Sequence, residues 1–339
     1  MQTSSAVSQL YTERDGQRGA KHVIACVDRS EHARKVVPHA FAVASALRVP
    51  VTLLQVLEAP PTKDFRLDPV EWDIRRHESR NDLKRLAEAC ADGVEIVDAE
   101  LVEGETTEEI CRWAQQGSAE LIVLGTHGER GAEEFGIGST ARHVLETAAG
   151  AILLVPISTA SARVPHYRRI LVPLDGSSWS ESVLPLAVRL ARGADAELIL
   201  VHAIPVPELI ETDPLEAEDI DLRERLIDRN ERVARSYLDR VRGYAAEQGL
   251  RVRALTLRGD DIRSSLTKFI GGERVDLVVL SARGHGGARV SDVPYGNVAA
   301  YLLTHSPIPI LIVRPTGSSS NMHPAAKREA GRPPIRPVV

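Results

Sequence analysis

Residues 21 to 47 read KHVIACVDRSEHARKVVPHAFAVASAL, and residues 168 to 194 read RRILVPLDGSSWSESVLPLAVRLARGA. Each stretch begins with a short apolar run that ends in an aspartate, Asp28 or Asp175, and then continues through a serine into apolar residues at helical spacing. Because the two stretches align without a gap when the aspartates are superimposed, the chain contains an internal repeat. Each copy is therefore predicted to start as a strand, a turn and a helix.

The rest of each copy alternates strands with helices. The segments VTLLQVLE (51–58) and AELILVHAI (196–204) are short, apolar and rich in β-branched residues, which predicts buried strands. Charged helical segments follow at about 73–91 and 218–248. Alternation of this kind predicts right-handed crossovers and a parallel sheet covered on both faces. The predicted fold class is α/β, with two tandem, doubly wound, five-stranded domains of Rossmann-like type.

Length and composition set the domain plan. The 339 residues suit two domains, predicted at 20–157 and 167–315, with a linker at 158–166. The ends, 1–19 and 316–339, lack periodicity and are predicted to be disordered.

Charge and cysteine usage exclude several partners. The 42 Lys and Arg residues against 47 Asp and Glu, a net charge of -5, supply no uniform basic field, so no nucleic-acid partner is expected. The three cysteines, Cys26, Cys90 and Cys111, are widely spaced and are read as reduced thiols. No apolar run approaches the roughly 20 residues that span a bilayer, so no membrane partner is expected and the cytoplasm is the predicted location.

The stretch that carries chemistry is LIVLGTHGERGAEEFGIGSTARHVL, residues 121–145. A strand is predicted to end at Leu124 and a helix to begin at Ser139, with Gly125, Gly128 and Gly138 between them. Glycines at a strand-to-helix junction let backbone approach a ligand, and a helix N-terminus presents unpaired N–H groups to phosphate.

The spacing of these glycines resembles the nucleotide-binding members of the universal stress protein family. Their pattern is Gly, two residues, Gly, nine residues, Gly and then Ser or Thr, and Gly125, Gly128, Gly138 and Ser139 match it completely. The resemblance covers both copies. It implies an adenine-nucleotide α-hydrolase-like fold, an ATP ligand, and a magnesium or manganese ion that bridges the phosphates.

The resemblance also implies roles for single residues. Asp28 would contact the adenosine half of ATP, and adenine would lie against Val56. Gly125 and Gly128 would approach the ribose and phosphates. The whole candidate site of the first copy comprises strand ends, loop glycines and helix-start hydroxyls: Val27, Asp28, Val56, Leu124, Gly125, Gly128, Gly138, Ser139 and Thr140.

The second copy departs from this pattern in residues 278–303. Ser281 replaces the first glycine, eleven residues instead of nine separate Gly284 from Gly296, and Asn297 replaces the hydroxyl residue. An ATP site there is less strongly predicted. Its candidate residues are Asp175, Ala203, Gly284, Gly296 and Asn297.

Binding is favoured over catalysis because no nucleophile–base pair and no set of metal ligands is recognisable in the sequence. The leading hypothesis is an ATP-binding regulatory or stress-response protein with an unknown protein partner. A slow ATPase or phosphotransferase at the same site, and a scaffold that binds no nucleotide, remain open alternatives. The apolar final strands, 151–157 and 308–315, are expected to pair and to join the copies as a pseudo-dimer within the chain, and a homodimer is also possible.

Overall fold

The computed structural model describes residues 21–58, 68–90, 97–116, 119–128, 136–159, 164–205, 217–259, 261–284 and 295–314. The predicted tails, part of the linker and segments 129–135 and 285–294 of the two glycine-rich loops lie outside the described residues.

Each repeat is a chain of alternating strands and helices. The first contains β1 (His22–Val27), α2 (Ala33–Leu47), β2 (Val51–Leu57), α3 (Pro69–Cys90), β3 (Val97–Glu103), α4 (Thr106–Gln116), β4 (Ala119–Gly125), α5 (Ser139–Thr147) and β5 (Gly150–Val155). The second contains β6 (Arg169–Pro173), α6 (Ser178–Glu181), α7 (Leu184–Gly193), β7 (Glu197–Pro205), α8 (Ala217–Ala246), β8 (Val252–Gly259), α9 (Ile262–Gly272), β9 (Leu277–Ser281), α10 (Asn297–His305) and β10 (Ile310–Arg314).

The described strands form one sheet in the order β3-β2-β1-β4-β5-β10-β9-β6-β7-β8. Each repeat supplies five parallel strands, and the predicted α/β fold class is confirmed. The two halves meet where β5 and β10 pair in antiparallel fashion, with Leu153 opposite Leu311, so the predicted pairing of the final strands is confirmed. Because this pairing is antiparallel, the carboxyl ends of the strands point to opposite edges of the sheet in the two repeats.

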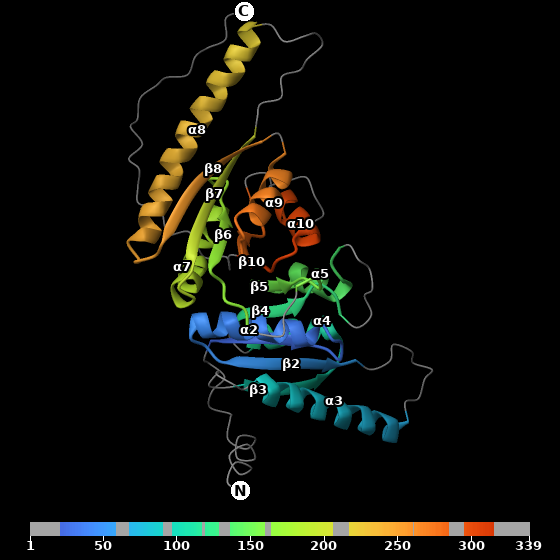
Figure 1. The fold of residues 1–339 in the computed structure, drawn as a ribbon. Helices are drawn as coiled ribbons and strands as arrows, with labels where there is room; N and C mark the ends of the chain where they lie inside the picture. The colour runs from blue at the N-terminus through green and yellow to red at the C-terminus, as the bar shows by residue number, and fades with distance from the viewer. Residues whose placement is uncertain are drawn as a thin grey trace, which may run out of the picture.

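Helices cover both faces of the continuous sheet (Figure 1). One apolar cluster packs α2, α7 and α8 against one face, and a second packs α4, α5, α9 and α10 against the other. Figure 1 shows the two repeats stacked along the sheet, with α3 and α8 near its opposite ends. None of the helices in the described ranges is long and apolar enough to cross a bilayer.

The second repeat departs from the prediction of one helix after each aspartate. The helix there is interrupted between α6 and α7, whereas the equivalent helix of the first repeat, α2, continues through Pro38. Ser177 Oγ accepts a hydrogen bond from the Ser180 N–H at 3.1 Å, and Ser182 Oγ donates to the Trp179 carbonyl at 2.6 Å. These serines satisfy backbone groups around the break. Proline alone does not cause it, because Pro38 lies inside α2 at the position equivalent to Pro185.

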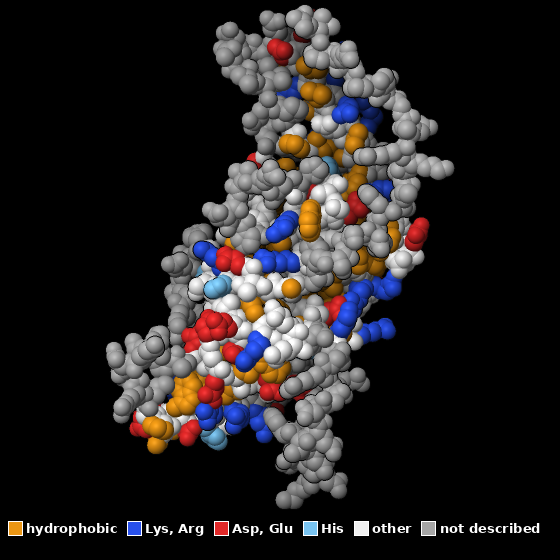
Figure 2. Space-filling view, turned by 180° about the vertical axis from the view of Figure 1, so that it is seen from behind, with side chains coloured by type: hydrophobic (Ala, Val, Ile, Leu, Met, Phe, Trp, Pro, Cys, Tyr) orange, Lys and Arg blue, Asp and Glu red, His pale blue; other side chains and the backbone are white. Residues whose placement is uncertain are grey.

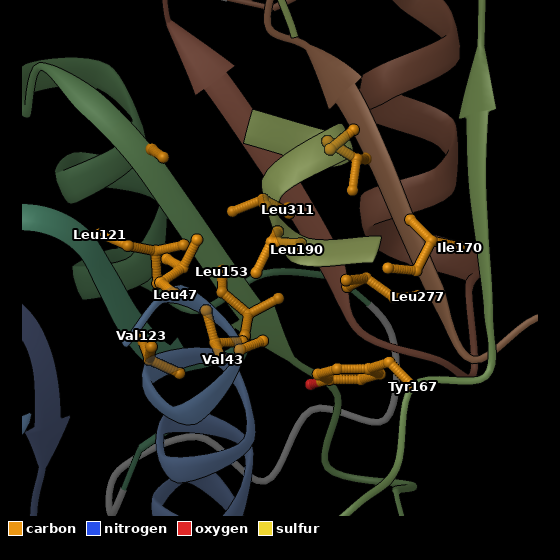
Figure 3. Close-up of a cluster of buried hydrophobic side chains, with 14 of the residues drawn as sticks. Val43, Leu47, Leu121, Val123, Leu153, Tyr167, Ile170, Leu190, Leu277 and Leu311 are labelled. Atoms are coloured by element: carbon orange, nitrogen blue, oxygen red, sulfur yellow. The ribbon is translucent and has the colours of Figure 1, made fainter. Parts of the chain in front are cut away.

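The repeats also touch through α2 and α7. Side chains of both helices converge on the joined strands (Figure 3), where the labelled residues include Val43, Leu47, Leu190, Leu153 and Leu311. An ideal Cβ placed on Gly193 of α7 would lie 1.8 Å from the carbonyl oxygen of Ala46 in α2. The two helices are thus in direct backbone contact at this glycine.

A buried polar pair ties the start of the second repeat to α2. His39 Nδ1 lies 2.6 Å from the Tyr167 hydroxyl, and both side chains are buried. His39 Nε2 has no hydrogen-bond partner among the described residues. Burial lowers the pKa of His39 from 6.5 to about 4, because a charged imidazolium would be poorly solvated there.

The low pKa of His39 predicts that the folded protein loses stability in acid. Since its pKa is lower in the folded chain, its neutral form contributes stability above pH 6.5, and that contribution falls as the pH drops toward 4. We expect a loss of about 3 kcal/mol in unfolding free energy over this range, measured by urea denaturation. His39→Gln should remove most of that pH dependence, while His77→Gln on exposed α3 should keep it. An unchanged pH dependence in His39→Gln would contradict the assignment.

Candidate functional site

The first candidate site lies at a topological switch point. β1 stands between β2 and β4, so the chain leaves β1 toward one side and returns through β4 on the other. Asp28 follows β1, and Gly125 ends β4. Since these strands are parallel, their carboxyl ends meet at one edge of the sheet, where doubly wound folds bind ligands.

Asp28 is held by its own turn and faces a glycine of the loop that follows the neighbouring strand, β4. Its Oδ1 accepts hydrogen bonds from Ser30, from the N–H at 3.0 Å and from the hydroxyl at 2.5 Å. An ideal Cβ on Gly128 would lie 2.7 Å from Asp28 Oδ2. Glycine at position 128 therefore allows the backbone to approach the carboxylate. Asp28 does not cap α2, because His32 occupies the N-cap position.

The start of α5 is attached to the end of β4. The Gly138 N–H donates to the Thr126 carbonyl at 2.7 Å, and the Thr126 N–H donates to the Val155 carbonyl at 3.0 Å. Gly138 is the N-cap residue, and no side chain caps the helix. Ser139 is exposed and Thr140 partly exposed. The first turn of α5 thus presents N–H groups and hydroxyls at the edge that also carries Asp28.

The apolar candidate residues divide into two groups. Val27 and Leu124 are buried in the clusters on opposite faces of the sheet, so their side chains belong to the core. Val56 is partly exposed and lies near the end of β2, beside β1, where its neighbour on β3 is Val102. Of these three side chains, that of Val56 is the most accessible to a ligand.

Sequence reasoning did not place Thr126 or His127 among the site residues. Both are buried, and the Thr126 backbone joins β4, β5 and the start of α5. His127 Nδ1 lies 3.2 Å from Thr126 Oγ1. Their position between the two matched glycines was the available signal, but spacing alone says nothing about which backbone groups hold the loop.

The second repeat has the equivalent hydrogen bonds and close backbone approaches, although its sequence differs. Asp175 Oδ1 accepts from Ser177, from the N–H at 2.9 Å and from the hydroxyl at 2.6 Å. An ideal Cβ on Gly284 would lie 2.6 Å from Asp175 Oδ2, and the Gly296 N–H donates to the Ala282 carbonyl at 2.8 Å. The backbone frame of the site is therefore common to both repeats.

The side chains of the two sites differ. Asn297 is the exposed first residue of α10, and the N-cap position belongs to Gly296. Ala203 on β7 is partly exposed and lies beside Leu257, much as Val56 lies beside Val102. Asp175 is exposed, whereas Asp28 is partly buried.

The described residues near the first site offer neither a reactive thiolate nor a cluster of metal ligands. Burial raises the pKa of the Cys26 thiol far above its ordinary range, so this residue stays protonated. Within the described ranges, no three His, Cys, Asp or Glu side chains are grouped to hold a metal ion. Acidic and basic side chains are interspersed over the face seen in Figure 2.

Comparison with known proteins gives a consistent result. Residues 19–156 and 166–314 each match the model of the universal stress protein family. A universal stress protein of Thermus aquaticus is 31% identical over 149 residues, which are 44% of this chain and 99% of the relative. One from Mycobacterium tuberculosis is 26% identical over 198 residues, which are 58% of this chain and 62% of the relative.

Solved structures show the same tandem fold. The crystal structure of a universal stress protein from Archaeoglobus fulgidus superimposes with a TM-score of 0.61 at 17% identity, covering 86% of this chain and 98% of its own. A functionally unknown protein from Pseudomonas aeruginosa gives a TM-score of 0.57 at 17% identity, covering 88% of this chain and 94% of its own. Likeness at this identity establishes the fold.

Proposed function

The chain belongs to the universal stress protein family, and on that premise we propose that it binds ATP, mainly in the first repeat, and acts as a regulatory or stress-response protein. The observation that carries the proposal is the arrangement at the first switch point. Asp28 and Gly128 face each other there, and Gly138 begins an uncapped helix attached to the same strand end.

The parts of this site suit the parts of a nucleotide. The first turn of α5 offers N–H groups, a partial positive charge and the hydroxyls of Ser139 and Thr140, which are complementary to phosphate oxygens. The Asp28 carboxylate can accept a hydrogen bond from the adenosine half, and Val56 offers apolar surface for a ring. A magnesium or manganese ion would be held chiefly by phosphate oxygens, as is usual for magnesium with nucleotides.

A regulatory role requires that ATP change an equilibrium. A ligand achieves this only through different affinity for two states of the protein or for its complex with a partner. We propose a protein partner, still to be identified, whose binding depends on occupancy of the first repeat. A homodimer is one form that such a complex can take.

Gly138→Val tests the phosphate end of the site. We expect about one ATP bound per chain, and an affinity lowered by roughly 30-fold in the variant, the loss of about 2 kcal/mol of charge-assisted hydrogen bonds. The new Cβ would lie 3.1 Å from the Thr126 oxygen, and the side chain would obstruct the helix N-terminus. Titration calorimetry with magnesium and ATP measures the effect.

The matched control is Gly296→Val in the second repeat. The nearest atom to a Cβ there lies 3.9 Å away, so the variant should fold and keep the wild-type ATP affinity. Undiminished affinity in Gly138→Val would place the site elsewhere. Sustained release of ADP that Gly138→Val abolishes would instead favour the slow ATPase, and no ATP binding by the wild-type chain would favour the scaffold.

Asp28→Ala tests the adenosine end. We expect ATP affinity to fall by about 1 to 3 kcal/mol if the carboxylate accepts a hydrogen bond from the ligand. Since Asp28 also holds Ser30, the control is Ser30→Ala, which removes the donor hydroxyl and leaves the carboxylate. Equal losses of affinity in the two variants, measured by calorimetry, would show that Asp28 acts only by shaping its turn.

A further inference from the structure

Helix α8 extends beyond the sheet that it covers. It contains 30 residues, and among the described residues the apolar clusters include its side chains only from Tyr237 onward. Figure 1 shows its N-terminal half beyond the ends of β7 and β8. Residues 218–235 are its leading segment. Because helices in proteins are stabilised mainly by packing of an apolar face, the leading segment has little of the usual support.

The leading segment carries a row of apolar side chains in contact with solvent. Leu222 and Val233 are 51% and 59% exposed, and Leu226 between them is partly exposed. Spacings of four and seven residues place these three side chains in one row along a helix. Ile220 is also exposed. Single exposed apolar residues are common, but a row of this kind is typical of a surface on which another helix packs.

The rotation of the helix is fixed by a buried carboxylate. Glu231 accepts a hydrogen bond from Arg235 at 2.6 Å and also pairs with Arg258 of β8. At 3.6 residues per turn, Val233 points away from the side of the helix that carries Glu231. The apolar row therefore cannot turn onto the sheet without breaking these contacts.

The charges of the leading segment are complementary to the same segment read in the opposite direction. Its centre lies between Leu226 and Ile227, and charged residues at equal distances on either side of that centre have opposite signs. The pairs are Glu218 with Arg235, Asp221 with Arg232, Glu224 with Arg229, and Arg225 with Asp228. In an antiparallel pair of copies, these opposite charges stand at the same level, whereas a parallel pair would bring identical charges together.

The same arrangement brings apolar residues to one level. Ile220 stands opposite Val233 of the second copy, and Leu226 stands opposite Ile227. Within one chain Arg225 already pairs with Asp221 at 2.7 Å, but both side chains are exposed, and such contacts contribute little. We therefore assign the affinity to the apolar row and the antiparallel orientation to the charges.

The composition of the leading segment disfavours other classes of partner. Six acidic residues stand against five arginines between 218 and 235. Anionic lipid surfaces and nucleic acids are bound by an excess of basic residues, which this segment lacks.

We propose that two copies of this chain associate through antiparallel pairing of their leading segments. The pairing has two-fold symmetry, so it closes with both segments covered. It is independent of ATP binding in the first repeat. Eighteen residues of helix are about 27 Å long, so the contact is below the standard size of a stable interface and the dimer is weak.

Sedimentation velocity of the full chain from about 1 to 200 µM measures the association. We expect a dimer with a Kd on the order of 10 µM. Leu222→Glu and Val233→Glu should each raise this Kd at least about 10-fold, since each places a charge in the apolar row. At concentrations far below the Kd the chain is a monomer, so these exposed positions should not affect its unfolding.

Ile74→Glu is the matched control. Ile74 lies on α3, the equivalent helix of the first repeat, and is 53% exposed, so the variant should dimerise as the wild type does. Gly138→Val should also dimerise normally, whether or not the chain binds ATP. A wild-type chain that stays monomeric, or an unchanged Kd in both Leu222→Glu and Val233→Glu, would overturn the proposal.

Cysteine cross-linking tests the orientation. Leu226→Cys, beside the centre, should be joined to its own copy by a short bismaleimide. Ile220→Cys should not, because in an antiparallel pair the two copies of residue 220 are separated by 13 residues of helix, about 20 Å. The wild-type chain, with its own three cysteines, gives the background. Equal cross-linking of the two variants would show a parallel pair and contradict the antiparallel arrangement.

Discussion

Leu311→Lys is expected to disrupt the pairing of β5 with β10, which joins the two repeats. It should lower the free energy of unfolding by about 4 kcal/mol or more. Leu311 is fully buried on β10, directly opposite Leu153 on β5, and belongs to the cluster under α2 and α7. A lysine there would bury a charge with no partner, which is among the most costly single changes in a protein. Against a typical total of roughly 5 to 15 kcal/mol, this is a large fraction.

Urea denaturation and thermal melting measure the effect, and Leu222→Lys is the control. Leu222 lies on α8 and is 51% exposed, so a lysine there should change stability little. Leu311→Ala should fall between the two, with about 2 to 5 kcal/mol lost to the cavity. Wild-type melting of Leu311→Lys would mean that the β5–β10 joint does not support the fold.

Gly193→Ala is expected to destabilise the chain by about 3 kcal/mol, although a single methyl group is added. The new Cβ would lie 1.8 Å from the Ala46 oxygen and 2.7 Å from the Ala46 Cα. These are backbone atoms of α2, so no side chain can move aside. Helices α2 and α7 would have to separate, which would disturb the buried cluster beneath them.

The control for this substitution should have the opposite sign. Gly243 lies in α8, and a Cβ there meets nothing within 4 Å. Gly243→Ala should therefore stabilise the chain by up to about 1 kcal/mol, because alanine loses less conformational freedom in a helix. Equal effects of the two substitutions on urea denaturation would contradict close packing of α2 on α7.

Several features of the candidate site could be predicted from the sequence. The glycine spacing indicated where backbone must come close to other groups, and the structure brings Gly128 against Asp28 and Gly138 against Thr126. The roles of Val27 and Leu124 were harder to predict, since a residue at a strand end can face the ligand or the core. Their burial follows from the helices packed on each face, which a local pattern does not reveal.

The second repeat shows the limit of motif matching. Its longer loop and missing hydroxyl argued against equivalence, yet Gly284 approaches Asp175 as Gly128 approaches Asp28, and the Gly296 N–H makes the same kind of hydrogen bond as the Gly138 N–H. The hydrogen bond from Gly296 to Ala282, and that from Ala282 to Val313 at the end of β10, form despite the longer loop. The contact of Arg283 with Trp179 was equally hidden, because the two residues come from separate segments of the chain.

Periodicity and repetition in the sequence by themselves determined that this chain forms two α/β repeats with parallel strands. Apolar strands and amphipathic helices have local patterns, and their alternation leaves few topologies open. Only the tertiary structure decided how closely α2 and α7 pack, and how Gly284 and Gly296 meet Asp175 and Ala282. Those features depend on contacts between distant segments, whose energies exceed the weak preferences of any single residue.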